Sequence, residues 1–166
     1  MVHTKSYATK IIIQEFRMEN LLNILDKNQI LIKNMELDLF EIKNIHKHFS
    51  PDSIIEGLVG YSLKGEPSGD VRNIIEYTNK INTKKLSLDV PAGLDLNIKK
   101  FYKIYFITDA VLTLALPKDR MQIEENKKNI KKLFLADISI PPSLYKLLPS
   151  KLETSNIFLD SEIVKA

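Results

Sequence analysis

Short apolar runs alternate with stretches of helical spacing along the chain. Residues 10–16 hold three consecutive isoleucines, and polar residues end this apolar run, a pattern that suits a strand buried on both faces. Comparable runs predict further strands at residues 30–32, 53–59, 85–90, 110–116 and 133–138. Helical spacing, uneven in the second case, predicts helices at residues 19–27, 37–46, 70–82 and 121–128.

This alternation indicates crossover connections, which build an α/β fold with a mostly parallel sheet. Ligands bind such sheets at the carboxyl ends of the strands, so we expect chemistry in the loops after Val59, Val90 and Leu116. Asp70 is the expected N-cap of its helix. Residues 149–166 are expected to lie as a tail on a domain formed by residues 1–148.

Composition narrows the class of protein. The chain has 166 residues, 44% of them hydrophobic and 27% charged, which is typical of one soluble globular domain. It contains no cysteine, so disulfides, thiolate nucleophiles and cysteine-ligated metal sites are excluded. His46 and His48 would lie on different faces of a helix and have no convincing third ligand, so we expect no transition metal.

The net charge of +3 is spread along the chain, and nearly all positive residues are lysines. Proteins that read nucleic acid usually cluster arginine, so we expect no nucleic-acid partner. The lysines of residues 127–132, beside Glu124 and Glu125, form either a solvated helix face or a patch for an anionic partner. No apolar run approaches the ~20 residues of a membrane span, and residues 1–10 hold no signal-peptide core, so we expect a cytoplasmic protein.

The loop at residues 60–66 has features of a ligand-binding connection. Gly60 and Gly65 allow the backbone to turn tightly and to approach a ligand closely. Ser62 offers a hydroxyl group and Lys64 a positive charge. The helix expected after this loop points its amino end toward the same edge, where anions are favoured. A plain connection between a strand and a helix would have the same features.

Asp89 ends the next predicted strand, ahead of Pro91 and Gly93. A parallel sheet places catalytic or ion-binding carboxylates at this position. An aspartate there can also cap the loop by accepting hydrogen bonds from backbone N–H groups, and both interpretations stay open. Asp95 is interpreted as a turn residue, and Lys118 as part of the ligand-side loop after residues 110–116.

Four segments carry motifs that resemble one known family. Residues 89–95, D-V-P-A-G-L-D, are similar to D-I/V-P-S-G-L/W-D, and residues 60–66 resemble the substrate loop after a D-A-L/I-F/L-G strand. Residues 113–118, T-L-A-L-P-K, are similar to T-L/V-A/T-L/F-x-P-K, and residues 137–142, D-I-S-I-P-P, to D-I-G-I-P-P. Any one of these motifs would be weak evidence alone, but four in this order are specific for one family. They resemble the motifs of the YjeF amino-terminal domain family.

The resemblance implies a Rossmann-like, three-layer αβα fold and an isomerase of nicotinamide-cofactor repair. The family comprises NAD(P)H-hydrate epimerases, which interconvert the R and S forms of NADHX and NADPHX. The resemblance makes Asp89 the catalytic candidate and implies a potassium ion near Glu56 and near Ala92, where the family has serine. The substrate-binding residues that it implies are Gly60, Tyr61, Ser62, Leu63, Lys64, Gly65, Glu66, Asp89 and Lys118.

Three departures from the family pattern modify these expectations. The family's opening strand and its N-N-G-G-D-G phosphate loop have no counterpart in the 166 residues. Ala92 has no side-chain oxygen and Glu56 replaces an aspartate, so a weakened or absent potassium site is expected. Without a central first strand, the strand at residues 10–16 must pair elsewhere, which predicts a homodimer or a partner chain that completes the sheet.

Two functions stay open on the sequence. The first is an epimerase in which Asp89 is catalytic, while Lys64 and Lys118 hold anionic parts of the dinucleotide. The second is a non-catalytic nucleotide-binding or scaffold domain of the same fold. The missing phosphate loop favours the second function, and the retention of Asp89, Lys64 and Lys118 favours the first.

Overall fold

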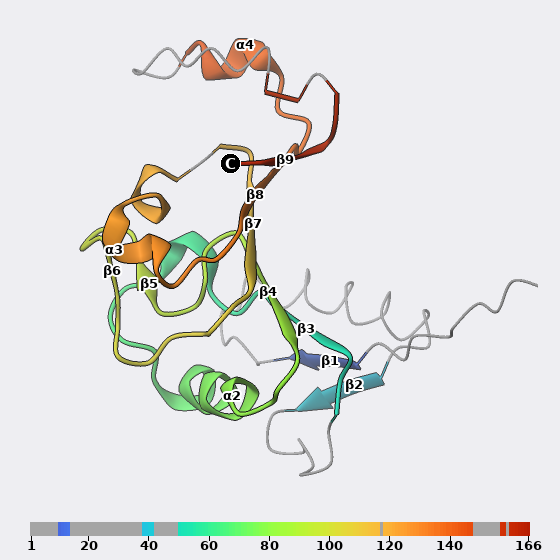
Figure 1. Ribbon diagram of the computed structural model, residues 1–166, viewed down its shortest axis with the longest axis vertical. Helices are drawn as coiled ribbons and strands as arrows, with labels where there is room; N and C mark the ends of the chain where they lie inside the picture. Colours follow the sequence, from blue (N-terminus) through green and yellow to red (C-terminus); the bar gives the residue numbers. More distant parts are fainter. Residues whose placement is uncertain (1–9, 14–37, 42–49, 117, 148–156, 159) are drawn as a thin grey trace, which may run out of the picture. The chain divides into compact units, whose positions relative to one another are not determined.

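The computed structural model describes residues 10–13, 38–41, 50–116, 118–147, 157–158 and 160–166, and Figure 1 shows the course of the chain. The chain divides into two compact units, residues 1–49 and residues 50–166. Within the described ranges, no helix has both the length and the apolar composition that a bilayer crossing requires.

The described part of the first unit is a pair of parallel strands, β1 (Lys10–Ile13) and β2 (Asp38–Glu41). The strand predicted at residues 10–16 is therefore confirmed where the structure describes it. Leu39 lies opposite Ile11 in the register of this pair.

The helix predicted at residues 37–46 is wrong over residues 38–41, because these residues form a strand. The uneven spacing of the apolar residues gives no continuous helical stripe to bury, so pairing with β1 prevails. The elements predicted at residues 19–27 and 30–32 lie outside the described residues, as do His46 and His48.

The second unit is built on a five-stranded sheet with the order β3-β4-β7-β8-β9. The pairs β3–β4, β4–β7 and β7–β8 are parallel, whereas β9 runs antiparallel to β8. The expected α/β fold with a mostly parallel sheet is thus confirmed. The strands are β3 (Ser53–Glu56), β4 (Lys84–Leu88), β7 (Ala110–Leu114), β8 (Leu133–Ala136) and β9 (Ile163–Lys165).

One long helix, α2 (Gly69–Asn79), connects β3 to β4 and buries Ile74 and Ile75. The N-cap position belongs to Ser68, so the prediction of Asp70 as the cap is wrong, and Asp70 lies in the first turn. An acidic side chain there still favours the helix through the macrodipole. The shorter elements are η2 (Gly60–Ser62), β5 (Leu94–Asp95), β6 (Lys100–Phe101), η3 (Asp119–Met121), α3 (Glu124–Lys127) and α4 (Pro142–Tyr145).

The core of the second unit lies on one face of the sheet. Ile75 of α2 forms a buried hydrophobic cluster with Ala92 and Phe106 from the long connection between β4 and β7. Ile54 of β3 packs against this cluster. On the opposite face of β3, Ile55 is 65% exposed, because successive residues of a strand point to opposite faces.

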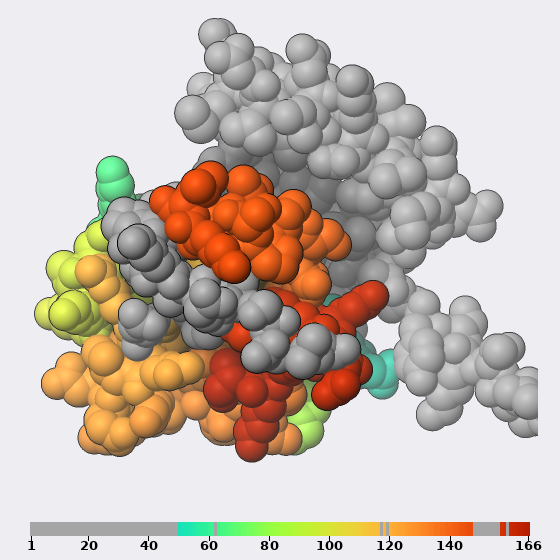
Figure 2. All heavy atoms as spheres, turned by 90° about the horizontal axis from the view of Figure 1, so that it is seen from above, coloured from blue at the N-terminus to red at the C-terminus, as the bar shows by residue number. Residues whose placement is uncertain are grey.

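The described segment at residues 137–147, coloured orange to red, lies on the surface that Figure 2 presents. In α4, Tyr145 is buried, whereas Leu144 is 51% exposed. Strand β9 covers the edge of β8, and the Ala166 N–H group donates a hydrogen bond of 3.0 Å to the Leu133 carbonyl oxygen.

Candidate active site at the carboxyl edge of the sheet

Asp89 directly follows β4 and is held in an unusual backbone conformation. Its N–H group donates a hydrogen bond of 2.8 Å to the Leu112 carbonyl oxygen, which extends the ladder between β4 and β7. Its φ angle is +62°, in the left-handed region that aspartate tolerates better than most residues. The chain therefore leaves the strand at Asp89 and presents this carboxylate at the carboxyl edge of the sheet.

The glycine loop after β3 meets the Asp89 carboxylate. A Cβ atom built on Gly60 would lie 3.4 Å from Asp89 Oδ2, so the two segments are in close contact. Gly60 itself has a φ angle of +63°. A side chain at this position would be strained by the backbone, and its Cβ atom would be in van der Waals contact with the carboxylate. The sequence-based expectation that these two segments share an edge of the sheet is confirmed.

Lys118 forms an ion pair with Asp89. The Lys118 Nζ atom lies 2.7 Å from Asp89 Oδ1, with side chains 18% and 22% exposed. The same Nζ atom donates a hydrogen bond of 2.8 Å to the Leu114 carbonyl oxygen at the end of β7. Two of the three hydrogen-bond donors of the ammonium group are thus engaged within the protein.

The loop at residues 60–66 is anchored at its carboxyl end. The Tyr102 hydroxyl group is hydrogen-bonded to the backbone of Gly65. The Glu66 carboxylate accepts a hydrogen bond of 3.1 Å from the Ile104 N–H group. Glu66 therefore fastens the loop to the connection between β4 and β7.

The remaining residues predicted in this loop differ in exposure. Tyr61 is 65% exposed and Lys64 is also exposed, whereas Leu63 is buried. The side chain of Ser62 lies outside the described part of the structure. Tyr61, Lys64 and Glu66 are therefore the exposed side chains among the described residues of this loop.

Glu56 ends β3 as a buried carboxyl group, 4% exposed. Its Oε1 atom accepts a hydrogen bond of 2.6 Å from the Leu58 N–H group, and its Oε2 atom accepts one of 2.5 Å from the Ser87 hydroxyl group. Burial raises the pKa of Glu56 above its ordinary value, against the lowering effect of these donors. Ser87 is a site residue that the motifs do not indicate. The available signal is that a serine inside a buried strand requires a hydrogen-bond partner.

Ala92 presents its backbone rather than its side chain to Glu56. The Ala92 N–H group lies 3.4 Å from Glu56 Oε2, and the residue is 1% exposed inside the cluster with Ile75 and Phe106. Among the described residues, no group of three His, Asp or Glu side chains is arranged to hold a metal ion.

A second carboxylate network shapes the turn beyond Ala92. Asp95 accepts hydrogen bonds from the Tyr102 hydroxyl group at 2.7 Å and from the Asn97 N–H group at 2.7 Å. The hydrogen bond from Tyr102 is the main reason why the pKa of Asp95 is lowered, and the same bond raises the pKa of Tyr102. Asp95 thus stabilises a turn, as its position in the sequence indicates.

Asn79, at the end of α2, is a further residue that sequence reasoning missed. Its side-chain amide donates to the Tyr105 carbonyl oxygen at 2.8 Å and accepts from the Ile107 N–H group at 2.9 Å. One asparagine therefore pairs with two backbone groups of a segment without regular structure. An asparagine at this place indicates the end of a helix. Its hydrogen-bond partners depend on the path of a distant loop, which the spacing of apolar residues does not predict.

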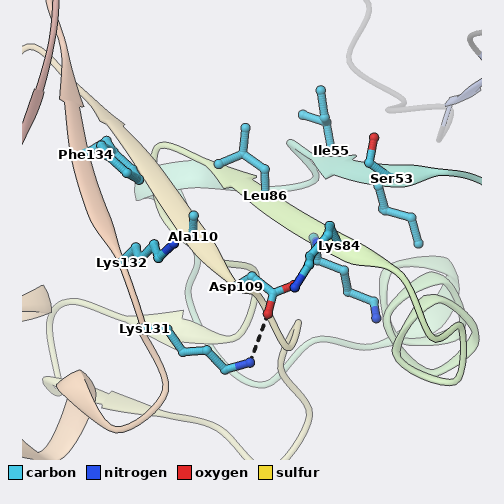
Figure 3. A pocket seen from close by; sticks show the side chains of 11 residues that line it. Ser53, Ile55, Lys84, Leu86, Asp109, Ala110, Lys131, Lys132 and Phe134 are labelled. Atoms are coloured by element: carbon cyan, nitrogen blue, oxygen red, sulfur yellow. Dashed lines mark hydrogen bonds and ion pairs between the residues drawn. The ribbon is translucent and has the colours of Figure 1, made fainter. Parts of the chain in front are cut away.

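A groove of about 670 Å³ lies over the amino-terminal halves of the strands, on the face of the sheet opposite the core. Figure 3 shows Ile55, Leu86 and Phe134 along it, with Lys84 and Lys132 nearby. Asp109 and Lys131 form an ion pair of 2.9 Å at its border. Asp89, by contrast, follows the carboxyl end of β4 and is not among the residues that line this groove.

A comparison with protein families shows which family the chain is related to. The model of the family described as YjeF-related protein N-terminus matches residues 7–120, more than half of the 166 residues. The chain belongs to the YjeF_N family.

Curated relatives of this YjeF_N chain are matched over part of their length. An NAD(P)H-hydrate epimerase from Dehalogenimonas lykanthroporepellens is 36% identical over 94 residues, which are 57% of this chain and 37% of the relative. Another, from Pirellula staleyi, is 26% identical over 132 residues, 78% of this chain and 58% of the relative. A bifunctional NAD(P)H-hydrate repair enzyme Nnr from Dictyoglomus turgidum is 32% identical over 92 residues, 55% of this chain and 17% of the relative. The chain spans less than two thirds of each of these relatives.

A solved structure supports the fold. The crystal structure of yeast ynu0, YNL200c, matches 96% of this chain and 66% of that chain with a TM-score of 0.63. The sequences are 16% identical in this comparison, so the similarity concerns the fold alone. It agrees with the Rossmann-like α/β architecture expected for a YjeF_N chain.

Proposed function

We propose that this chain is an isomerase of the NAD(P)H-hydrate epimerase type, acting in the cytoplasm on NADHX or NADPHX. The observation that carries the proposal is the contact between Gly60 and Asp89, which brings the glycine loop and a carboxylate to one edge of the sheet. The names of the curated relatives support the same reaction.

The reaction requires a group that can transfer a proton to and from the oxygen atom bound to the carbon that is inverted. In the hydrated nicotinamide ring this carbon carries a hydroxyl group next to a ring nitrogen. When the C–O bond breaks, the nitrogen lone pair forms an iminium bond, and the hydroxyl group leaves as water after it receives a proton. Water then adds to the other face and gives a proton back. We assign both transfers to Asp89. The protonated carboxyl group gives its proton to the leaving hydroxyl group, and the resulting carboxylate, which can pair with Lys118, takes a proton back from the entering water. Such a role typically contributes about 10²–10⁴-fold in rate.

The surrounding residues suit the orientation of a dinucleotide. The ion pair between Lys118 and Asp89 fixes the rotamer of the carboxylate. Tyr61 and Lys64 are exposed on the same loop as Gly60, where an aromatic ring and a positive charge can contact the substrate. Gly65 and Glu66 hold the loop through Tyr102 and the Ile104 N–H group.

Potassium, which the family resemblance implies, does not fit the described residues well. The carboxyl group of Glu56 already accepts three hydrogen bonds, and Ala92 supplies no side-chain oxygen. The proposed proton transfers at Asp89 therefore contain no step that depends on a cation.

We also propose that residues 1–148 form the YjeF_N-like domain and that residues 149–166 form a tail packed on it. The pairing of β9 with β8 supports the packing of residues 163–165 on the domain. A second copy or a partner chain is proposed to complete the sheet, because β3 is an edge strand within the described residues.

The test is to incubate the chain with R-NADHX and to follow the R/S ratio by chromatography. We expect epimerisation well above the spontaneous rate. Asp89→Asn, which keeps the size of the side chain and tolerates the same backbone conformation, should lower the rate about 10²-fold or more. Lys64→Gln should mainly raise KM. The proposal fails if the wild-type chain does not exceed the spontaneous rate.

A non-catalytic nucleotide-binding domain is the second candidate. The residues at the implied potassium position favour it, because the Glu56 carboxyl group is already hydrogen-bonded and Ala92 supplies no side-chain oxygen for the family's ion. Calorimetric titration with ADP-ribose separates the two candidates. Binding without epimerisation would establish the binding domain in place of the enzyme.

A further inference from the structure

The Glu56 carboxyl group joins three segments at the carboxyl edge of the sheet. Its hydrogen-bond donors are the Leu58 N–H group at 2.6 Å, the Ser87 hydroxyl group at 2.5 Å and the Ala92 N–H group at 3.4 Å. Leu58 follows β3, Ser87 lies in β4, and Ala92 belongs to the turn after Asp89. With the side chain 4% exposed, these donors replace water around the carboxyl group.

We infer that Glu56 is an internal clamp that occupies the position of a bound cation, so that this chain folds independently of potassium. This inference does not rest on the proposed epimerase activity, because it concerns only the hydrogen bonds that hold the fold. It departs from the family resemblance, which implies a potassium ion at this position.

The orientation of the donors opposes a cation. Two N–H groups and one hydroxyl group direct their positive ends at the Glu56 oxygens. A cation that approached these oxygens would be repelled by the same dipoles, and it would have to displace short hydrogen bonds. Hard cations need several oxygen ligands, whereas the three groups recorded against the Glu56 oxygens all act as donors.

The environment of Ala92 supports the same inference. The residue is 1% exposed and its methyl group belongs to the cluster with Ile75 and Phe106. Its carbonyl oxygen accepts a hydrogen bond of 2.8 Å from the Phe106 N–H group. Both backbone groups of Ala92 are therefore used within the protein, and its side chain faces apolar atoms.

The hydrogen bonds of Glu56 stabilise the turn after β4. The turn that it holds contains Asp89 with a φ angle of +62° and Gly93 with a φ angle of +97°. Left-handed conformations cost free energy and persist only where the surrounding structure holds them. The bonds from Ser87 and Ala92 to one carboxyl group connect this turn to the ends of β3 and β4.

The experiment compares thermal unfolding of the full chain in KCl and in tetramethylammonium chloride at equal ionic strength. For the wild-type chain we expect the same midpoint in both salts. Glu56→Gln removes one acceptor oxygen and leaves a buried donor unpaired, so the midpoint should fall by about 5 °C or more, equally in both salts. Ser87→Ala should also lower the midpoint without creating a difference between the salts.

Glu66→Gln is the matched control, because Glu66 also accepts a backbone hydrogen bond but is exposed. Its midpoint should stay within about 2 °C of the wild-type value. A midpoint of the wild-type chain that rises specifically in KCl, with the rise lost in Glu56→Gln, would overturn the inference. This result needs no substrate, so it is independent of whether the chain epimerises NADHX.

Discussion

At the scale of single residues, the backbone of the turn after β4 limits which side chains can be accommodated. Gly93 has a φ angle of +97°, and a Cβ atom built on it would lie 2.5 Å from both the Ile104 carbonyl oxygen and the Tyr105 Cα atom. Real Cβ atoms do not approach backbone atoms this closely. Gly65 has a φ angle of +85°, but nothing lies within 4 Å of a Cβ atom built there.

Gly93→Ala should therefore destabilise the chain by about 2–5 kcal/mol, because backbone strain adds to a steric clash with rigid atoms. Gly65→Ala should cost about 1–2 kcal/mol, because it introduces the strain alone. Urea unfolding of the two variants beside the wild-type chain measures both values. Equal losses would show that the close approach of residues 104 and 105 is not rigid.

At the scale of elements, the sequence predicts the positions of the strands better than it predicts the hydrogen bonds between the loops that connect them. The apolar runs predicted β3, β4, β7 and β8 to within a few residues, because each strand is buried on at least one face. The contact of Gly60 with Asp89 followed from the rule that parallel strands end at one edge. The hydrogen bonds of Asn79, Tyr102 and Lys118 were not predicted, because they connect residues 26, 7 and 29 positions apart through irregular loops.

The hairpin formed by β5 and β6 should be sensitive to acid. The pKa of Asp95 is lowered chiefly by the Tyr102 hydroxyl group, so the carboxylate contributes stability above its unfolded pKa of about 3.9 and loses it as the pH falls through the lower folded value. Tyr102→Phe should thus be less stable than the wild-type chain at neutral pH. This difference should shrink below about pH 4. Urea unfolding across a pH series measures it.

Tyr61→Phe serves as the control for that series, because Tyr61 is 65% exposed. Its free energy of unfolding should follow that of the wild-type chain at every pH. A Tyr102→Phe deficit that stays constant from neutral to acid pH would mean that the hydroxyl group acts through Gly65 rather than through Asp95.

At the scale of the whole molecule, the two edges of the five-stranded sheet differ in how they end. Strand β9 covers β8 at one edge, whereas β3 forms the other edge within the described residues. Ile55 in β3 is 65% exposed. An edge strand with a large exposed apolar side chain favours association, and this is the surface on which we expect a second copy or a partner chain.

Ile55→Lys should therefore shift the chain from a dimer to a monomer in size-exclusion chromatography with light scattering, since a charge on an edge strand opposes pairing. Its thermal midpoint at high dilution should change little. Ile98→Lys is the control, because Ile98 is 47% exposed but lies outside the sheet. A wild-type mass equal to one chain would contradict the proposed dimer.

The left-handed backbone at Asp89 has a consequence for any mutational survey of this position. Asparagine and glycine tolerate a φ angle near +62°, whereas β-branched and bulky residues do not. A library randomised at codon 89 and sorted for folded protein should thus be enriched in aspartate, asparagine and glycine before any selection for turnover. The amino acids preferred at this codon would then reflect both the backbone conformation of the turn and the need for a carboxylate. Only the comparison of aspartate with asparagine would isolate the effect of the carboxylate.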